Sequence, residues 1–198
     1  ETGKYDQLRD SIIDRPSQIG LENATLTWGT TSRRPEAPSS SDSGADAFRL
    51  INVNVNFPIG RLSIIAGPTG SGKTSMLMAL LGEMRLVEGR VHLPGGLASR
   101  AELPVDPGTG LIDSVAYCAQ EAWLVNDTVK ENIIFASPYD EKRYRAVLKA
   151  CALERDIEIL DAGDQTLVGE KGISLSGGQK QRISLARAVY SSARHLLL

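Results

Sequence analysis

Two glycine-rich motifs constrain this chain more than any other feature of its sequence. The first is GPTGSGKT, from Gly67 to Thr74, and the second is LSGGQ, from Leu175 to Gln179. A loop of the form G-x-x-x-x-G-K-[ST] predicts backbone N–H groups that surround a polyphosphate, while a lysine and a hydroxyl meet its charge and its Mg²⁺. The second motif again places glycines at the start of a predicted helix. Each motif is rare by chance, and the occurrence of both in this order points to nucleotide chemistry.

The residues around the first motif have the periodicity that such a loop requires. The short apolar run Leu62–Ala66 lies between Gly60 and Gly67 and predicts a fully buried parallel strand that leads into the loop. After Lys73 an apolar pattern with helical spacing continues up to Gly82, so strand, loop and helix follow in order. The apolar residues of this predicted helix are Met76, Leu77, Leu80 and Leu81.

Two strands and two loop insertions are expected elsewhere in the first half. Apolar and polar residues alternate up to Trp28 and again from Val53 to Phe57, which predicts half-buried strands. Residues 30–47 contain five serines and no large apolar side chain, which predicts a disordered insertion. Its serines near Arg33 and Arg34 are either phosphorylation sites or part of a tolerated surface loop. Residues 94–112, rich in proline and glycine, predict a second loop insertion.

The second half predicts one strand, several helices and a final apolar run. The strand Ser114–Ala119 ends at Gln120, and Thr128 with Glu131 forms a capping box for a short helix. Further helices are predicted by apolar faces at Tyr144, Val147, Leu148 and Cys151, then at Leu153, Ile157 and Leu160, and finally, after the second motif, at Ile183, Ala186, Val189 and Tyr190. The last residues, from His195 to Leu198, begin another apolar run.

The two motifs together resemble the nucleotide-binding domain of ABC (ATP-binding cassette) transporters, with Gly67–Thr74 as Walker A and Leu175–Gln179 as the signature. The resemblance covers nearly the whole chain, and QEAWLVNDTVKENIIF from Gln120 to Phe135 is similar to the first cassette of subfamily C transporters, the multidrug-resistance-associated type. It implies an α/β fold with a P-loop NTPase, RecA-like core on a mixed sheet, an antiparallel β lobe and an inserted helical lobe at about 121–178. Residues 1–18 would be a linker from a transmembrane domain and 19–198 the cassette.

The resemblance assigns roles to individual residues of the site. ATP and Mg²⁺ are the implied ligands, with Thr74 and Gln120 at the metal and Gln120 also near the attacking water, although a solvated glutamine at the end of a strand is the alternative for Gln120. Trp28 matches the aromatic residue that stacks on adenine, although core packing is the alternative for a strand tryptophan. Glu170 matches an acidic position that reports to coupling helices, or is an exposed loop carboxylate. The implied ATP-binding residues are Trp28, Gly67, Pro68, Thr69, Gly70, Ser71, Gly72, Lys73, Thr74 and Ser75, and the signature residues are Leu175, Ser176, Gly177, Gly178 and Gln179.

The implied partners are a second nucleotide-binding domain, joined head to tail, and the transmembrane domains of the same transporter. In that dimer each signature would close on the ATP of the opposite cassette. The fold is expected to be incomplete at its C-terminus, before the Walker B aspartate and the catalytic carboxylate, so the chain alone is not expected to hydrolyse ATP. The alternatives are a regulatory cassette that binds ATP without turnover and a soluble ABC ATPase unconnected to transport.

Bulk composition narrows the partners and the location. The chain has 22 basic and 24 acidic residues, a formal charge of −2, which gives no electrostatic basis for binding nucleic acid. Only two cysteines occur, and both are expected to be free thiols of a reducing compartment. The longest apolar run is far shorter than a membrane span. Composition thus favours a cytosolic location, and the resemblance implies a domain on the cytosolic face of a plasma or vacuolar membrane that does not itself bind cargo.

Overall fold

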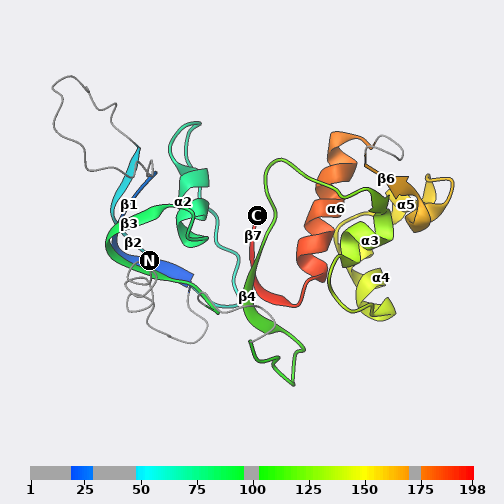
Figure 1. Ribbon diagram of the computed structural model, residues 1–198, viewed down its shortest axis with the longest axis horizontal. Coiled ribbons are helices and arrows are strands. Elements are labelled where there is room, and N and C mark those ends of the chain that lie inside the picture. Colours follow the sequence, from blue (N-terminus) through cyan, green and yellow to red (C-terminus); the bar gives the residue numbers. More distant parts are fainter. Residues whose placement is uncertain (1–18, 29–47, 96–102, 170–174) are drawn as a thin grey trace, which may run out of the picture. The chain divides into compact units, whose positions relative to one another are not determined.

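The computed structural model describes residues 19–28, 48–95, 103–169 and 175–198, and these fall into two compact units divided after residue 98. Figure 1 shows the order of their helices and strands. The predicted linker 1–18, the insertion 30–47 and Glu170 lie outside the described residues.

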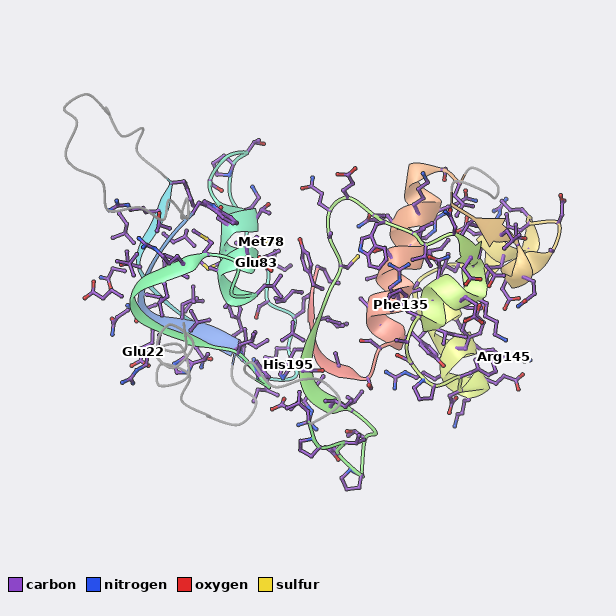
Figure 2. The ribbon with its side chains drawn as sticks, in the orientation of Figure 1. Glu22, Met78, Glu83, Phe135, Arg145 and His195 are labelled. Atoms are coloured by element: carbon purple, nitrogen blue, oxygen red, sulfur yellow. The ribbon has the colours of Figure 1, made fainter. Side chains whose placement is uncertain are left out.

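The first unit is built on a three-stranded antiparallel sheet of order β2-β1-β3. Its strands are β1 (Ile19–Thr27), β2 (Arg49–Phe57) and β3 (Arg85–His92). The two predicted strands are thus confirmed, and the central one, β1, carries the buried side chains. Leu26 lies opposite Leu50 on one side and Leu86 on the other, so the strand alternation places leucines together on one face. Glu22 of β1, which is labelled in Figure 2, pairs with the buried His92 of β3 at 3.2 Å.

The helix predicted after the glycine-rich loop is α2 (Lys73–Leu80), which packs against β1 and β3. Ala79 and Leu80 are its buried residues. The following turn contains Gly82, whose φ of 80° lies in the left-handed region. A glycine adopts this conformation without the cost that a Cβ would bring, and the helix therefore ends close to the position that the sequence predicts.

One element of the first unit differs from the prediction. Leu62–Ala66 forms no strand and pairs with none of the described strands; Leu62 is 84% and Ile64 79% exposed. A parallel strand is buried only if neighbouring strands pair with its edges and other elements cover its faces. The three strands of this unit pair with one another in an antiparallel sheet, and the run is not part of that sheet. The prediction of a buried parallel strand here is therefore wrong for this structure.

The second unit contains a parallel pair of strands, β4 (Ile112–Tyr117) and β7 (Ala193–Leu197), with Val115 opposite His195. β4 overlaps the predicted strand Ser114–Ala119, and β7 lies in the final apolar run and follows directly on the long helix α6 (Gly177–Tyr190). Antiparallel and parallel pairing thus both occur in this chain, as expected for a mixed α/β fold.

The remaining elements of the second unit are short helices and turns that lie between β4 and α6 in the sequence. They are α3 (Val129–Ile134), α4 (Glu141–Ala150), α5 (Glu154–Glu158) and the 3₁₀ turn η2 (Gly163–Gln165), with a two-residue ladder between β5 (Asp127–Thr128) and β6 (Leu167–Val168). The Thr128 hydroxyl accepts from the Glu131 N–H at 3.0 Å, which is one half of the predicted capping box. The Thr128 N–H instead donates to Asp127.

The core of this unit joins α3, α4 and α6. Tyr144, Val147, Ile183, Ala186 and Tyr190 are buried in it, as the helical patterns predict. The Tyr190 hydroxyl donates to the Pro138 carbonyl and accepts from the Asp140 N–H, so this buried polar group is fully paired. Cys118 and Cys151 are buried free thiols. None of the described helices has the length and apolarity that a membrane span requires.

Candidate functional site

The glycine-rich loop turns tightly before α2. Gly70 and Gly72 have φ angles of 81° and 89°, which ordinary side chains rarely adopt. The Ser71 N–H donates to the Pro68 carbonyl at 3.2 Å and closes the turn. The Lys73 ammonium folds back over the loop and donates to the carbonyls of Gly67 at 3.0 Å and Pro68 at 2.8 Å. Within the part of the chain that the structure describes, the Lys73 ammonium therefore has neutral carbonyl oxygens as its hydrogen-bond partners.

The N-terminus of α2 is open to a ligand. Helix geometry leaves the N–H groups of its first turn without partners inside the helix, and no side chain caps them. The first turn contains no acidic residue, and Thr74 in it is exposed. Unpaired N–H groups, the positive end of a helix dipole and an ammonium together suit a polyphosphate, and the exposed hydroxyl suits a Mg²⁺ bound to it. These residues therefore fit Mg²⁺-ATP.

Trp28 directly follows β1 and lies beside this loop. Its indole N–H donates to the Ser75 hydroxyl at 3.3 Å, and its side chain is 41% exposed. A tryptophan in the core would be largely covered, whereas this ring keeps a free surface while its polar edge is held against the first turn of α2. The structure thus brings Trp28, Lys73, Thr74 and Ser75 together in the first unit.

Gln120 and the signature belong to the second unit. Gln120 is exposed and follows β4 by three residues. In the signature, Leu175 is buried while Ser176, Gly177 and Gly178 are exposed. Among the residues that the structure describes, no neighbouring atom is found within 4 Å of the position that a Cβ on Gly177 would take. The two glycines at the start of α6 therefore lie on an exposed stretch of backbone.

Ser176 and Gln179 form a capping box at this helix terminus. The Ser176 hydroxyl accepts from the Gln179 N–H at 3.2 Å, and the Gln179 side-chain oxygen accepts from the Ser176 N–H at 2.9 Å. This reciprocal pair fixes the backbone that carries the two glycines. The sequence predicted a helix start here but not the role of Gln179 as the second half of the cap.

A charged pair missed by the sequence prediction extends this arrangement to α5. Arg182 donates to both carboxylate oxygens of Asp156, at 2.7 and 2.9 Å, and the Gln179 amide donates to the same carboxylate at 3.4 Å. The hydrogen bonds from Arg182 hold the pKa of Asp156 below its ordinary value. Arg182 lies three residues after Gln179, on the same face of the helix, and this spacing is the one signal that could have suggested it.

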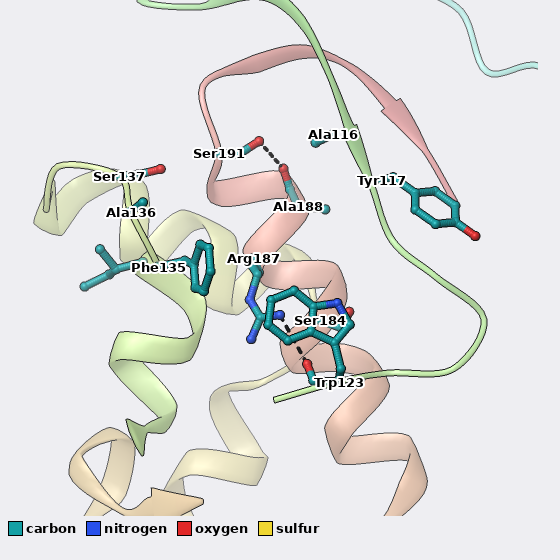
Figure 3. Close-up of a pocket in the computed structure, with 11 residues that line it drawn as sticks. Ala116, Tyr117, Trp123, Phe135, Ala136, Ser137, Ser184, Arg187, Ala188 and Ser191 are labelled. Carbon is teal, nitrogen blue, oxygen red and sulfur yellow. Dashed lines mark hydrogen bonds between the residues drawn. The ribbon is translucent and has the colours of Figure 1, made fainter. Parts of the chain in front are cut away.

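A second missed residue is Arg187, which lies in a pocket of about 160 Å³ in the second unit (Figure 3). Its guanidinium lies 4.0 Å from the ring centre of Trp123 and 5.1 Å from that of Phe135. It donates to the Asn132 carbonyl at 2.7 Å, the Asn132 side-chain oxygen at 2.8 Å and the Trp123 carbonyl at 3.1 Å. Burial lowers the pKa of this guanidinium. These contacts fix the chain on both sides of α3.

Comparison with known proteins supports the resemblance. Residues 50–198 match the family profile described as ABC transporter. The whole chain aligns at 58% identity with ABC transporter 7 of Pyricularia oryzae, at 54% with the ATP-dependent bile acid permease of Saccharomyces cerevisiae, and at 52% with the pleiotropic ABC efflux transporter of multiple drugs YBT1 of Candida glabrata. It spans only 12%, 11% and 11% of the lengths of these relatives.

The profile covers well over half of the chain, including both glycine-rich motifs and every described element of the second unit. Its match agrees with an α/β fold in which a glycine-rich loop with an open helix terminus is suited to phosphate. The chain belongs to the ABC transporter family, of which it is a nucleotide-binding domain.

Proposed function

We propose that this chain is the ATP-binding cassette of a full transporter of subfamily C type that exports organic anions or conjugates across a membrane from its cytosolic face. The observation that carries the proposal is the open N-terminus of α2 with Lys73 and Trp28 beside it. The printed names of the relatives, among them a bile acid permease and an efflux transporter of multiple drugs, support the substrate class.

Each residue of the loop has a task in this proposal. Lys73 leaves the carbonyls of Gly67 and Pro68 and pairs with the β and γ phosphates, whose charge makes them stronger acceptors. The N–H groups at the start of α2 bind the phosphate oxygens, and the Thr74 hydroxyl holds Mg²⁺, which neutralises the phosphate charge. Trp28 stacks on adenine with its exposed surface.

The signature serves a second ATP. Since Lys73 already meets the phosphates of one nucleotide, a second anion site at Ser176, Gly177 and Gly178 needs another ligand. In the proposed head-to-tail dimer that ligand is the ATP of the opposite cassette. The capping box fixes the backbone conformation of the signature that would bind it. Gln120 contacts the Mg²⁺ and the attacking water. Dimer closure on two nucleotides and reopening after hydrolysis drive transport.

ATP binding by Lys73→Ala tests the first part. The variant loses charge-assisted hydrogen bonds to phosphate, so its affinity for Mg²⁺-ATP falls by about 1.5–3 kcal/mol, roughly ten- to hundredfold. Isothermal titration of the full chain measures this. Lys142→Ala, which removes an exposed lysine of α4, is the matched control and leaves the affinity unchanged. Equal affinity in wild type and Lys73→Ala would overturn the assignment of the loop.

Phosphate release from the full-length transporter tests the second part. If hydrolysis is linked to transport, the wild-type transporter releases phosphate. The variant Ser176→Arg, which places a bulky cation at the signature, is then expected to abolish this release. Tight ATP binding without any release would instead support a regulatory cassette. Release that is unaffected when the transmembrane domains are removed would support a soluble ATPase.

A further inference from the structure

Phe48 is an exposed aromatic residue with no place in the assignments above. It immediately precedes β2, and 40% of its side chain is exposed. An exposed phenylalanine alone needs no explanation. This one, however, touches the glycine-rich loop.

The contact is with Gly72, the residue before α2. A Cβ built on Gly72 would lie 2.5 Å from the tip of the Phe48 ring, Cζ, and 3.3 Å from the adjacent Cε2. The edge of the Phe48 ring therefore lies against the α-carbon of Gly72, the residue before Lys73. The positive φ of Gly72 and this contact both exclude a side chain at that position.

Phe48 also stands opposite Trp28. β1 and β2 pair antiparallel, and their last registered pair at this end is Thr27 with Arg49. One step further along the same register are Trp28 and Phe48, which are 41% and 40% exposed. Trp28 bonds to Ser75, and Phe48 touches Gly72. Two half-exposed rings thus flank the start of α2 at the open end of one hairpin.

We propose that Phe48 is a second aromatic residue of the nucleotide site, contacting the ribose and base of ATP alongside Trp28. This inference rests on the proposed ATP-binding function. When the phosphates of ATP bind the loop, its ribose and base lie at the adjoining surface. Among the described residues, Trp28 and Phe48 provide the aromatic rings at that surface. The ring contacts Gly72 with one edge and is 40% exposed, so part of its surface is available to a nucleoside bound beside Trp28.

The experiment separates contact with the nucleoside from support of the loop. Affinities for Mg²⁺-ATP and Mg²⁺-tripolyphosphate are measured on the full chain by competition against a fluorescent ATP analogue. Phe48→Ala weakens ATP binding about five- to hundredfold, the range for loss of one aromatic contact with a base, and leaves tripolyphosphate affinity unchanged. Phe48→Trp keeps the ATP affinity within about twofold, because the larger ring preserves stacking. Ile51→Ala, an apolar truncation at a 70% exposed site on the same strand, changes neither affinity.

The remaining outcomes are decisive as well. If Phe48→Ala weakens ATP and tripolyphosphate equally, Phe48 only supports the loop, and the inference is wrong. If ATP affinity is unchanged, the inference is also wrong, while the proposed function stands. If the wild-type chain, with its native circular dichroism spectrum, does not bind ATP, the proposed function itself fails and takes the inference with it.

Discussion

At the scale of single residues, the contacts of Lys73 bear on how strongly the loop would bind a phosphate. Its ammonium has two carbonyl partners, at 3.0 and 2.8 Å, inside its own loop. ATP replaces these neutral acceptors with charged ones, so the net gain is the difference between two sets of hydrogen bonds. These two hydrogen bonds restrict the lysine side chain to the glycine-rich loop, so binding of a phosphate there would cost little further side-chain entropy.

Trp28 can be tested by its fluorescence, because the chain has only two tryptophans. In a Trp123→Phe background, Mg²⁺-ATP is expected to change the emission of Trp28, since stacking covers an exposed ring. Titration of fluorescence against nucleotide gives the same Kd as calorimetry. The control is Trp28→Phe with Trp123 retained, which is expected to show no such change. An unresponsive Trp28 at saturating ATP would count against adenine stacking.

At the scale of elements, the N-terminus of α6 depends on residues well beyond the signature. Ser176 and Gln179 cap each other, Gln179 contacts Asp156, and Asp156 is bound by two donors of Arg182. The Asp156 side chain is 16% and that of Arg182 38% exposed, so solvent screens this pair only in part. Through it, α5 fixes the orientation of the glutamine that completes the cap.

Acid unfolding tests this network. The folded-state pKa of Asp156 lies below its ordinary 3.8. The pair therefore contributes stability in full above that value, and loses it as pH falls through the lower folded-state pKa. At neutral pH, Asp156→Asn is expected to cost about 1–3 kcal/mol in urea unfolding, the worth of charged hydrogen bonds. The difference between wild type and variant then narrows below about pH 4.

An exposed ion pair of the same unit provides the control for that measurement. Arg145 and Glu141 pair at i,i+4 on α4 with both side chains largely exposed (Figure 2). Glu141→Gln is expected to cost at most about 0.5 kcal/mol. A stability difference for Asp156→Asn that is just as small, or that stays constant down to pH 2, would mean that the carboxylate is not stabilised in the folded state.

The sequence predicted elements whose signal is local and missed contacts that are distant. The helices from Lys73 and Gly177 were predictable, because helical spacing and glycine-rich starts lie within one segment. Leu62–Ala66 was predicted wrongly, because an apolar run does not reveal whether another strand will pair with it. Asp156 and Arg182 are 26 residues apart, and Asn132 and Arg187 are 55 apart. No local pattern joins such pairs, and the contact of Phe48 with Gly72 was likewise invisible.

At the scale of the whole molecule, each compact unit holds a different part of the nucleotide chemistry. The first contains the glycine-rich loop with Trp28, and the second contains Gln120 and the signature. A ligand that binds only the folded state raises the free energy of unfolding with the logarithm of its concentration, by about 2.7 kcal/mol at a hundred times its Kd. Protection from hydrogen exchange on ATP binding therefore reports which unit a nucleotide touches.

We expect Mg²⁺-ATP to slow amide exchange in residues 67–80 of the isolated chain, at concentrations where sedimentation shows a monomer, and to leave residues 175–182 unchanged. The reason is that the proposed signature site receives its nucleotide from another cassette. When the second cassette of the transporter is added, residues 175–182 are expected to become protected too. Lys73→Ala is expected to remove the protection of residues 67–80, because the chain's own nucleotide no longer binds. Part of the protection of residues 175–182 by the second cassette is expected to remain. Protection of the signature in the monomer would contradict the head-to-tail arrangement, since one chain would then hold a single ATP with both motifs.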